Sequence, residues 1–194
     1  MASYYYFAAQ LPYLVYGQPE PMSSGHFREL CTSFLNAGDR RRLEQCRLDI
    51  SAKSRQPPPP ETAGASSFLD NWEEWEGALR LNLARLRAQH LKREGAAPDA
   101  PGYPADAVHA AKAACAMDSP LEAELFLDKT RWDAIERLRG LDNFGSDFIF
   151  AYLLKLLLME RKTSFKTEKG FMEYKTLYAA IVNNYGGAES GEPK

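Results

Sequence analysis

The chain has 194 residues, a formal net charge of −2 at pH 7, 45% hydrophobic residues and 26% charged residues. This is the ordinary profile of a globular protein with a proper core, and the slightly acidic balance excludes wholesale electrostatic attraction to nucleic acid or anionic lipid. The three cysteines, Cys31, Cys46 and Cys115, include no close pair, so they argue against a disulfide framework and favour a reducing cytoplasm.

The first fifty residues carry short helical signals. The aromatic run at 4–6 favours a strand and the alanines that follow favour a helix, and we prefer the helix. Ser23 and Ser24 are candidate N-caps of a second helix, whose apolar positions are 27, 30, 31, 34 and 35. Gly38 is expected to end that helix in the left-handed conformation, and Asp39 to cap the next one.

A basic cluster follows at residues 40–55, where six cations face two carboxylates, a local surplus of four positive charges. A solvated helix face is the favoured interpretation, and contact with an acidic protein surface is the alternative. Nucleic acid is disfavoured because the aromatic residues and reading motifs of its binders are missing. The candidate partner interface consists of Arg40, Arg41, Arg42 and Arg47.

Two loop-like stretches interrupt the chain. Residues 56–66 contain four consecutive prolines, which remove amide donors and fix φ, so they predict an exposed connector. The alternative is that these prolines form a ligand for a small domain that recognises proline-rich segments. Proline and glycine predict a further loop at 95–107, and the tail at 186–194 is expected to be disordered. We expect one helical domain over residues 1–194.

The middle of the chain predicts a long amphipathic helix near 68–94. Apolar residues recur there at steps of three and four, including Trp72 and Trp75. Asp70 with Glu73 is a candidate capping pair at its start. Both tryptophans are expected in the core, and the alternative is an exposed aromatic anchor for a partner helix.

Stronger helical signals follow. Ser119-Pro120-Leu121-Glu122 is a capping sequence, and the helix that it opens is expected to end near Gly140. Eleven of the twelve residues at 148–159 are apolar or aromatic and cover every face of a helix, which predicts a central buried helix near 147–160. That run is too short to cross a membrane, which takes about 20 such residues. A last helix is expected at 171–184.

The chain offers no recognisable catalytic chemistry. His26, His90 and His109 lie at no metalloenzyme spacing, and the phosphate-binding, dinucleotide-binding and nucleophile-elbow motifs are missing. We therefore expect no catalytic, cofactor-binding or metal-ligating residues, and no enzyme. The overall expectation is an all-α helical bundle.

Three stretches carry a family resemblance. The first, Ser3–Pro12, reads Ser-Tyr-Tyr-Tyr-Phe-Ala-Ala-Gln-Leu-Pro; the second spans 27–39; and the third includes 132–136, 152–156, Glu160 and Arg161. They resemble a bacterial family of uncharacterised proteins that open with a Tyr-Tyr-Tyr motif followed by Leu-Pro, and that are encoded among the subunits of V-type ATP synthases. The third stretch also resembles, more distantly, the cap protein of the V/A-type ATPase (named C, or d in eukaryotes), which is all-helical and lies between the rotor axle and the membrane ring.

The resemblance implies a mechanical role without cofactors. The leading hypothesis is a non-catalytic structural, assembly or coupling component of a bacterial V-type ATP synthase, in the form of a short cap on the central stalk. Its partners would be central-stalk or membrane-ring subunits. It would be cytoplasmic, without inserting into the membrane, and peripheral to the inner membrane through those partners. The alternative is a helical regulatory adaptor that binds other proteins through Pro57–Pro60 or the Trp72 and Trp75 helix, and a third is an enzyme with a deep polar pocket.

Overall fold

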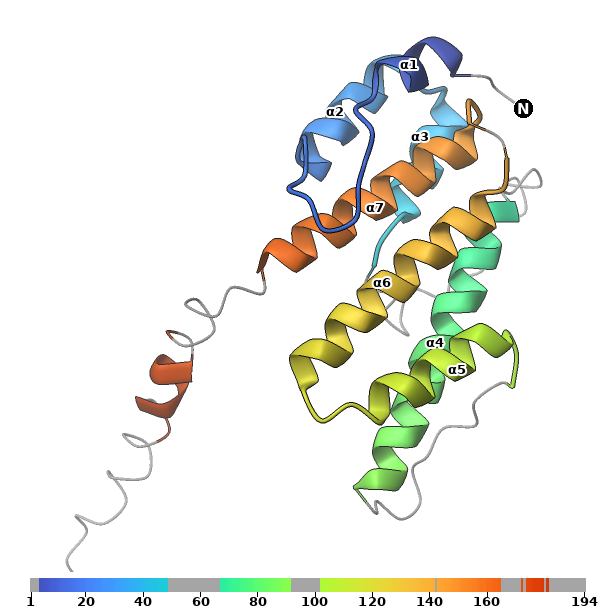
Figure 1. Cartoon of the computed structure of the whole chain (residues 1–194). Coiled ribbons are helices and arrows are strands. Elements are labelled where there is room, and N and C mark those ends of the chain that lie inside the picture. The colour runs from blue at the N-terminus through green and yellow to red at the C-terminus, as the bar shows by residue number, and fades with distance from the viewer. Residues whose placement is uncertain are drawn as a thin grey trace, which may run out of the picture. The chain divides into compact units, whose positions relative to one another are not determined.

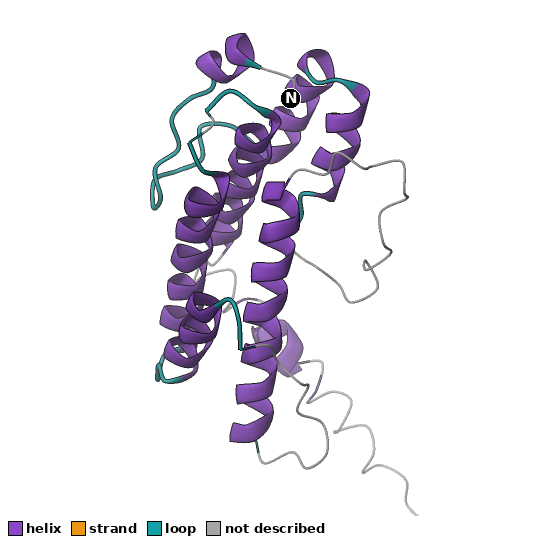
Figure 2. Ribbon diagram, turned by 90° about the vertical axis from the view of Figure 1, so that its right-hand side faces the viewer, coloured by secondary structure: helices purple, strands orange, loops and turns teal. Residues whose placement is uncertain are grey.

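The structure of the chain is a computed structural model (Figure 1). It describes residues 4–48, 67–91, 102–141, 143–164, 172, 174–179 and 181. The regular elements among these residues are helices, and none is a strand (Figure 2), which confirms the all-α prediction. The named helices are α1 (Tyr5–Gln10), α2 (Ser24–Phe34), α3 (Ala37–Gln45), α4 (Ser67–His90), α5 (Ala105–Cys115), α6 (Pro120–Arg139) and α7 (Ser146–Ser164).

The chain divides into two compact units, Met1–Glu160 and Arg161–Lys194. The first unit holds α1 to α6 and most of α7. The second holds a helical stretch at 174–179, inside the range for which the sequence predicts its last helix. Within the described ranges, none of the helices combines the length and the apolar character that a bilayer crossing requires.

Two of the predicted irregular segments, the connector at 56–66 and the tail at 186–194, lie outside the described residues. The loop predicted at 95–107 is shorter than expected at its C-terminal end, because α5 already begins at Ala105. Little in the local sequence points to α5, since its buried face is made of alanines: Ala107, Ala110, Ala111 and Ala114.

The central buried helix is α7, as the apolar run predicts. Its side chains are buried on every face: Ile149, Phe150, Ala151, Tyr152, Leu153, Leu154, Leu156, Leu158 and Met159. Phe27 of α2 stacks on Tyr152, with 4.9 Å between ring centroids. From α6, the Trp132 ring lies 4.8 Å from the ammonium of Lys155. Other elements of the protein therefore wrap α7, as its composition requires.

The long amphipathic helix is α4, and its tryptophans are core residues. Trp72 and Trp75 are buried and stacked on each other, with 5.7 Å between ring centroids. The Trp75 indole Nε1 donates to Asp106 of α5 at 2.8 Å. α5 packs against both α4 and α6, because its alanine face allows close approach. The alternative interpretation of this helix as an exposed aromatic anchor is therefore wrong.

The helix ends follow some of the sequence signals. Ser23 caps α2 and Ser119 caps α6, each accepting from the backbone three residues on. Gly140 ends α6 with a φ of +69°, a conformation in which glycine meets no Cβ penalty. The predicted cap of Asp70 with Glu73 is wrong, because α4 already begins at Ser67 and Asp70 lies within its first turn.

The predicted boundary at Gly38 is also wrong. Leu35 and Asn36 are extended, so α2 ends before them. Asn36 instead caps α3, and its side-chain oxygen accepts from the Asp39 backbone N–H at 2.8 Å. Gly38 consequently lies inside the first turn of α3. Asparagine and aspartate are equally good caps, and the tertiary contacts of Asn36, described below, favour it over Asp39.

A buried ion network links α4 to α6. Glu76 and Asp128 are 0% exposed and Arg131 is 4% exposed. The Arg131 guanidinium donates to Glu76 and to Asp128, each at 3.0 Å, and Arg80 donates to Glu76 at 2.7 Å. Burial alone would lower the pKa of Arg131, but the two carboxylates outweigh it and raise that pKa. Glu76 is therefore a buried partner of two arginines.

Candidate functional site

The aromatic start of the chain is anchored at Tyr4. Its hydroxyl donates to the Asp39 carboxylate at 2.5 Å and accepts from the Asn36 side chain at 2.9 Å. Its backbone N–H donates to the Phe144 carbonyl at 2.6 Å. Asn36 also donates to Asp39 at 2.9 Å, which closes a three-residue network. Tyr4 thus fixes α1 to the start of α3 and to the turn before α7.

This network makes a testable prediction for alkaline pH. Burial, reinforced by the Asp39 carboxylate, raises the pKa of Tyr4 from 10.0 to about 12. The unfolded chain therefore loses the Tyr4 proton first, so this contribution to stability is complete below pH 10 and declines as pH rises towards 12. Tyr4→Phe should cost about 1–3 kcal/mol at neutral pH, and urea unfolding should then show a shallower decline above pH 10.

The matched control is Tyr5→Phe, since Tyr5 is exposed and makes no described hydroxyl hydrogen bond. It should follow the wild-type pH profile within about 0.5 kcal/mol. Equal pH profiles for the two variants would contradict the assignment to Tyr4.

Behind Tyr4, a row of aromatic rings joins α1, α2 and α7. Phe7 stacks on Phe34 at 4.6 Å and on Phe27 at 6.0 Å, and Phe27 in turn stacks on Tyr152 at 4.9 Å. The Tyr152 hydroxyl donates to the Pro12 carbonyl at 2.9 Å. Contacts of this kind add to the burial of apolar area, so the row holds the N-terminal segment against the central helix.

A carboxylate of α7 completes the same attachment. Glu160 accepts from the backbone N–H of Ser24 at 2.6 Å and from its hydroxyl at 2.7 Å. A carboxylate at a helix N-terminus is favourable because it faces unsatisfied N–H groups and the positive end of the helix dipole. Residues 4–12, 23–39 and 132–160, far apart in sequence, therefore meet in one packed region.

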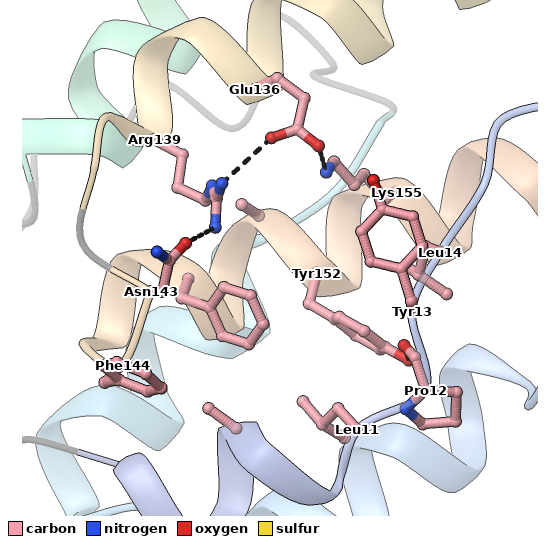
Figure 3. A pocket seen from close by; sticks show the side chains of 13 residues that line it. Leu11, Pro12, Tyr13, Leu14, Glu136, Arg139, Asn143, Phe144, Tyr152 and Lys155 are labelled. Atoms are coloured by element: carbon pink, nitrogen blue, oxygen red, sulfur yellow. Dashed lines mark hydrogen bonds and ion pairs between the residues drawn. The ribbon is translucent and has the colours of Figure 1, made fainter.

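A pocket of about 300 Å³ lies inside this region. One wall is apolar and comes from residues 8–14, with Leu11, Pro12 and Leu14; the other carries charged residues of α6 and α7 (Figure 3). Figure 3 shows the carboxylate of Glu136 between the Arg139 guanidinium and the Lys155 ammonium. The pocket is therefore amphipathic.

The charged wall is tightly interconnected. Glu136 pairs with Arg139 at 3.3 Å and with Lys155, and Arg139 also donates to Asn143 at 2.7 Å. The Arg139 guanidinium lies 5.5 Å from the centre of the Phe148 ring. Lys155 is only 8% exposed, and this burial lowers its pKa although Glu136 opposes the shift. Among the described lining residues, two cations face one carboxylate.

Aromatic residues surround the mouth of the pocket. Tyr13 lines the pocket and is 87% exposed, and Phe144 lines it and is partly exposed. Tyr5, also exposed, contacts the Phe144 ring with 4.6 Å between centroids. Exposed aromatic residues that gather in one place are a feature of binding surfaces. Sequence reasoning missed this site, because its walls come from segments more than a hundred residues apart.

The basic cluster predicted from the sequence lies elsewhere. Arg40, Arg41 and Arg42 are on α3 and Arg47 follows it. Arg40, Arg41 and Arg47 are exposed, whereas Arg42 is half-buried and pairs with Asp39 at 3.7 Å. Lys53 and Arg55 lie outside the described residues. The cluster does not line the pocket, and its role as a partner interface stays a prediction.

The cysteines divide by burial. Cys31 and Cys46 are buried free thiols and Cys115 is an exposed one. Burial raises the pKa of Cys31 to about 12 and also raises that of Cys46, which keeps both thiols protonated and unreactive at neutral pH. In the described part of the chain, no three His, Cys, Asp or Glu side chains gather in a way that would hold a metal ion.

Comparison with known proteins identifies no relative. No family model, no curated protein sequence and no solved structure significantly matches this chain.

Proposed function

We propose that this protein is a non-catalytic structural, assembly or coupling component of a bacterial V-type ATP synthase. In the finer form of the proposal, it is a short cap on the central stalk and contacts stalk or membrane-ring subunits. It would lie in the cytoplasm and reach the inner membrane through these partners.

One observation supports this proposal most. The segments that carry the family resemblance, at Tyr4–Pro12, 27–39 and, within the first unit, 132–160, are the segments whose described residues pack together around α7. Residues that carry the resemblance thus make contacts between these segments, from Tyr4 to Asp39 and from Tyr152 to Pro12. Glu160 contacts Ser24, which lies just before the second resembling stretch. A protein that transmits or resists torque must be stiff. Contacts that pack distant segments together provide stiffness, because close-packed protein interiors deform little.

The basic cluster supplies a candidate contact for those partners. Arg40, Arg41 and Arg47 remain exposed, as a steering surface for an acidic partner requires. The test is affinity capture of the tagged full chain from membranes of its own bacterium, with the recovered partners identified by mass spectrometry. We expect V-type ATP synthase subunits, with recovery falling as ionic strength rises because exposed charge pairs are screened.

A charge-reversal pair sharpens this experiment. The triple variant R40E, R41E, R47E should lower the recovery of ATP synthase subunits at least about tenfold. The control R85E, R87E, K112E changes the net charge equally, using exposed residues of α4 and α5, and should retain them. Wild-type capture that contains no part of the ATP synthase would overturn the proposed function, and equal recovery by both variants would remove the basic cluster from it.

A regulatory adaptor is the second candidate function. Trp72 and Trp75 cannot be the surface that binds its partners, because both side chains are buried. The other candidate surface, Pro57–Pro60, lies outside the described residues. The observation that favours it is the exposed aromatic mouth of the pocket, at Tyr5, Tyr13 and Phe144. Capture of one unrelated protein, lost on replacement of these aromatic residues, would support the adaptor.

A further inference from the structure

The pocket between residues 8–14 and helices α6 and α7 has a volume of about 300 Å³. This is the lower limit of small-molecule sites, roughly 300–1,000 Å³, and suits a ligand of about a dozen non-hydrogen atoms. Leu11, Pro12 and Leu14 offer it an apolar surface, and Arg139 and Lys155 offer positive charge opposite. The Phe148 ring lies beside the Arg139 guanidinium. A matching ligand therefore has an apolar body and a polar end.

The charges of the pocket select the sign of that polar end. Glu136 is the one carboxylate among the described lining residues, and it is shared by Arg139 and Lys155. The site consequently keeps a surplus of one positive charge when empty. Because Lys155 is buried, that surplus is poorly screened by water. A ligand with a single negative charge would neutralise the site, whereas a cation would add to the repulsion.

Hydrogen-bond donors remain for such an anion. An ammonium has three N–H donors, and Glu136 is the described acceptor for Lys155. The Arg139 Nε also has no hydrogen-bond partner among the described residues, but it is covered by protein, so Arg139 contributes positive charge and Lys155 the hydrogen-bond donors. We propose that this pocket binds a monocarboxylate carried on a small apolar body, with the carboxylate at Lys155 and Arg139 and the body against Leu11, Pro12 and Leu14.

The proposal is independent of the ATP synthase assignment, because the purified full chain is enough to test it. Trp132 is a built-in reporter, since its ring lies 4.8 Å from the Lys155 ammonium. The probe is 4-phenylbutyrate, and its neutral counterpart is 4-phenylbutanamide. The readout is the Trp132 indole N–H resonance in two-dimensional NMR, assigned with Trp132→Phe, and the Trp72 and Trp75 resonances serve as internal references.

We expect 4-phenylbutyrate to shift the Trp132 resonance saturably, with a Kd on the order of 1 mM, as ligand efficiencies of small compounds allow. The amide should bind at least about tenfold more weakly. The tripeptide Gly-Gly-Phe with a free carboxylate, compared with its C-terminal amide, then distinguishes two sources of the natural ligand. If the free-acid tripeptide also saturates the site, the ligand is the C-terminus of a peptide chain. If only phenylbutyrate saturates it, the ligand is a small molecule.

Two matched variants complete the test. Lys155→Met keeps the length and apolar stem of the side chain and should weaken binding at least about tenfold, whereas Lys155→Arg should restore part of it. Lys129→Met removes an exposed ammonium of α6 that pairs with Asp133 and does not line the pocket, so it should bind as the wild type does. The proposal is overturned by a linear, unsaturable response, by equal affinity for acid and amide, or by full binding in a folded Lys155→Met protein.

Discussion

Replacing Arg131 by methionine is expected to lower the free energy of unfolding by about 3–5 kcal/mol. The reason is that Glu76 and Asp128 are both fully buried and Arg131 is hydrogen-bonded to each. Removing the cation takes the Arg131 hydrogen bond from buried Asp128 and leaves Glu76 with Arg80, whose side chain is one-third exposed. The free energy is read from urea unfolding monitored by circular dichroism.

Arg137→Met is the matched control for this prediction, because it removes an arginine of the same helix. The ion pair of Arg137 with Asp106 is about half exposed on both sides, and exposed pairs contribute only about 0–1 kcal/mol. If the free energies of unfolding of the two variants differ by less than about 1 kcal/mol, the buried ion network around Glu76 does not stabilise the packing of α4 on α6.

A loss of similar size is expected at Phe27, the ring between α1 and α7. Phe27 is 0% exposed and stacks on both Phe7 and Tyr152. Phe27→Ala removes the ring from the middle of that row and leaves a cavity, which in cores costs about 3–5 kcal/mol. The free energy of unfolding should fall by that amount, measured by the same urea titration.

Phe34→Ala is its control. Phe34 contacts Phe7 in the same row but is 41% exposed, so less area returns to water and the cost should be about 1–2 kcal/mol. Equal losses in the two variants would contradict the view that Phe27 holds the N-terminal segment on α7.

The parts of the fold that the sequence predicted are those with strong local signals. The run at 148–159 is apolar on every face and forms the central helix α7, and the stripe through Trp72 and Trp75 forms α4. The Ser119 cap and Gly140 bound α6 as expected. In each case the deciding interaction lies within a few residues of the signal, so the pattern alone was sufficient.

The parts that the sequence did not predict depend on weak or distant signals. α5 was missed because alanine is a poor marker of burial, although its alanines at 107, 110, 111 and 114 follow helical spacing. The local sequence predicts a helix end at Gly38, because the contact of Asn36 with Tyr4, thirty-two residues away, does not appear in it.

Charged residues show the same limit more clearly. Glu76 resembles any surface carboxylate of a helix start until Arg131, fifty-five residues away, is placed against it. The pocket likewise depends on bringing Pro12 to Tyr152, and the sequence carries no period or motif for such a pairing. The basic residues at 40–47 were conspicuous by composition, yet they contribute nothing to the pocket walls.

The proposed association with a V-type ATP synthase can be measured from the side of the synthase. The synthase is purified from membranes of the source cells through a tag on one of the synthase subunits, after cross-linking in intact cells. This chain is then quantified in the preparation by mass spectrometry. We expect the chain to copurify, with cross-links from residues near Arg40, Arg41 or Arg47 to stalk or ring subunits. A synthase recovered intact without this chain, before and after cross-linking, would contradict the association.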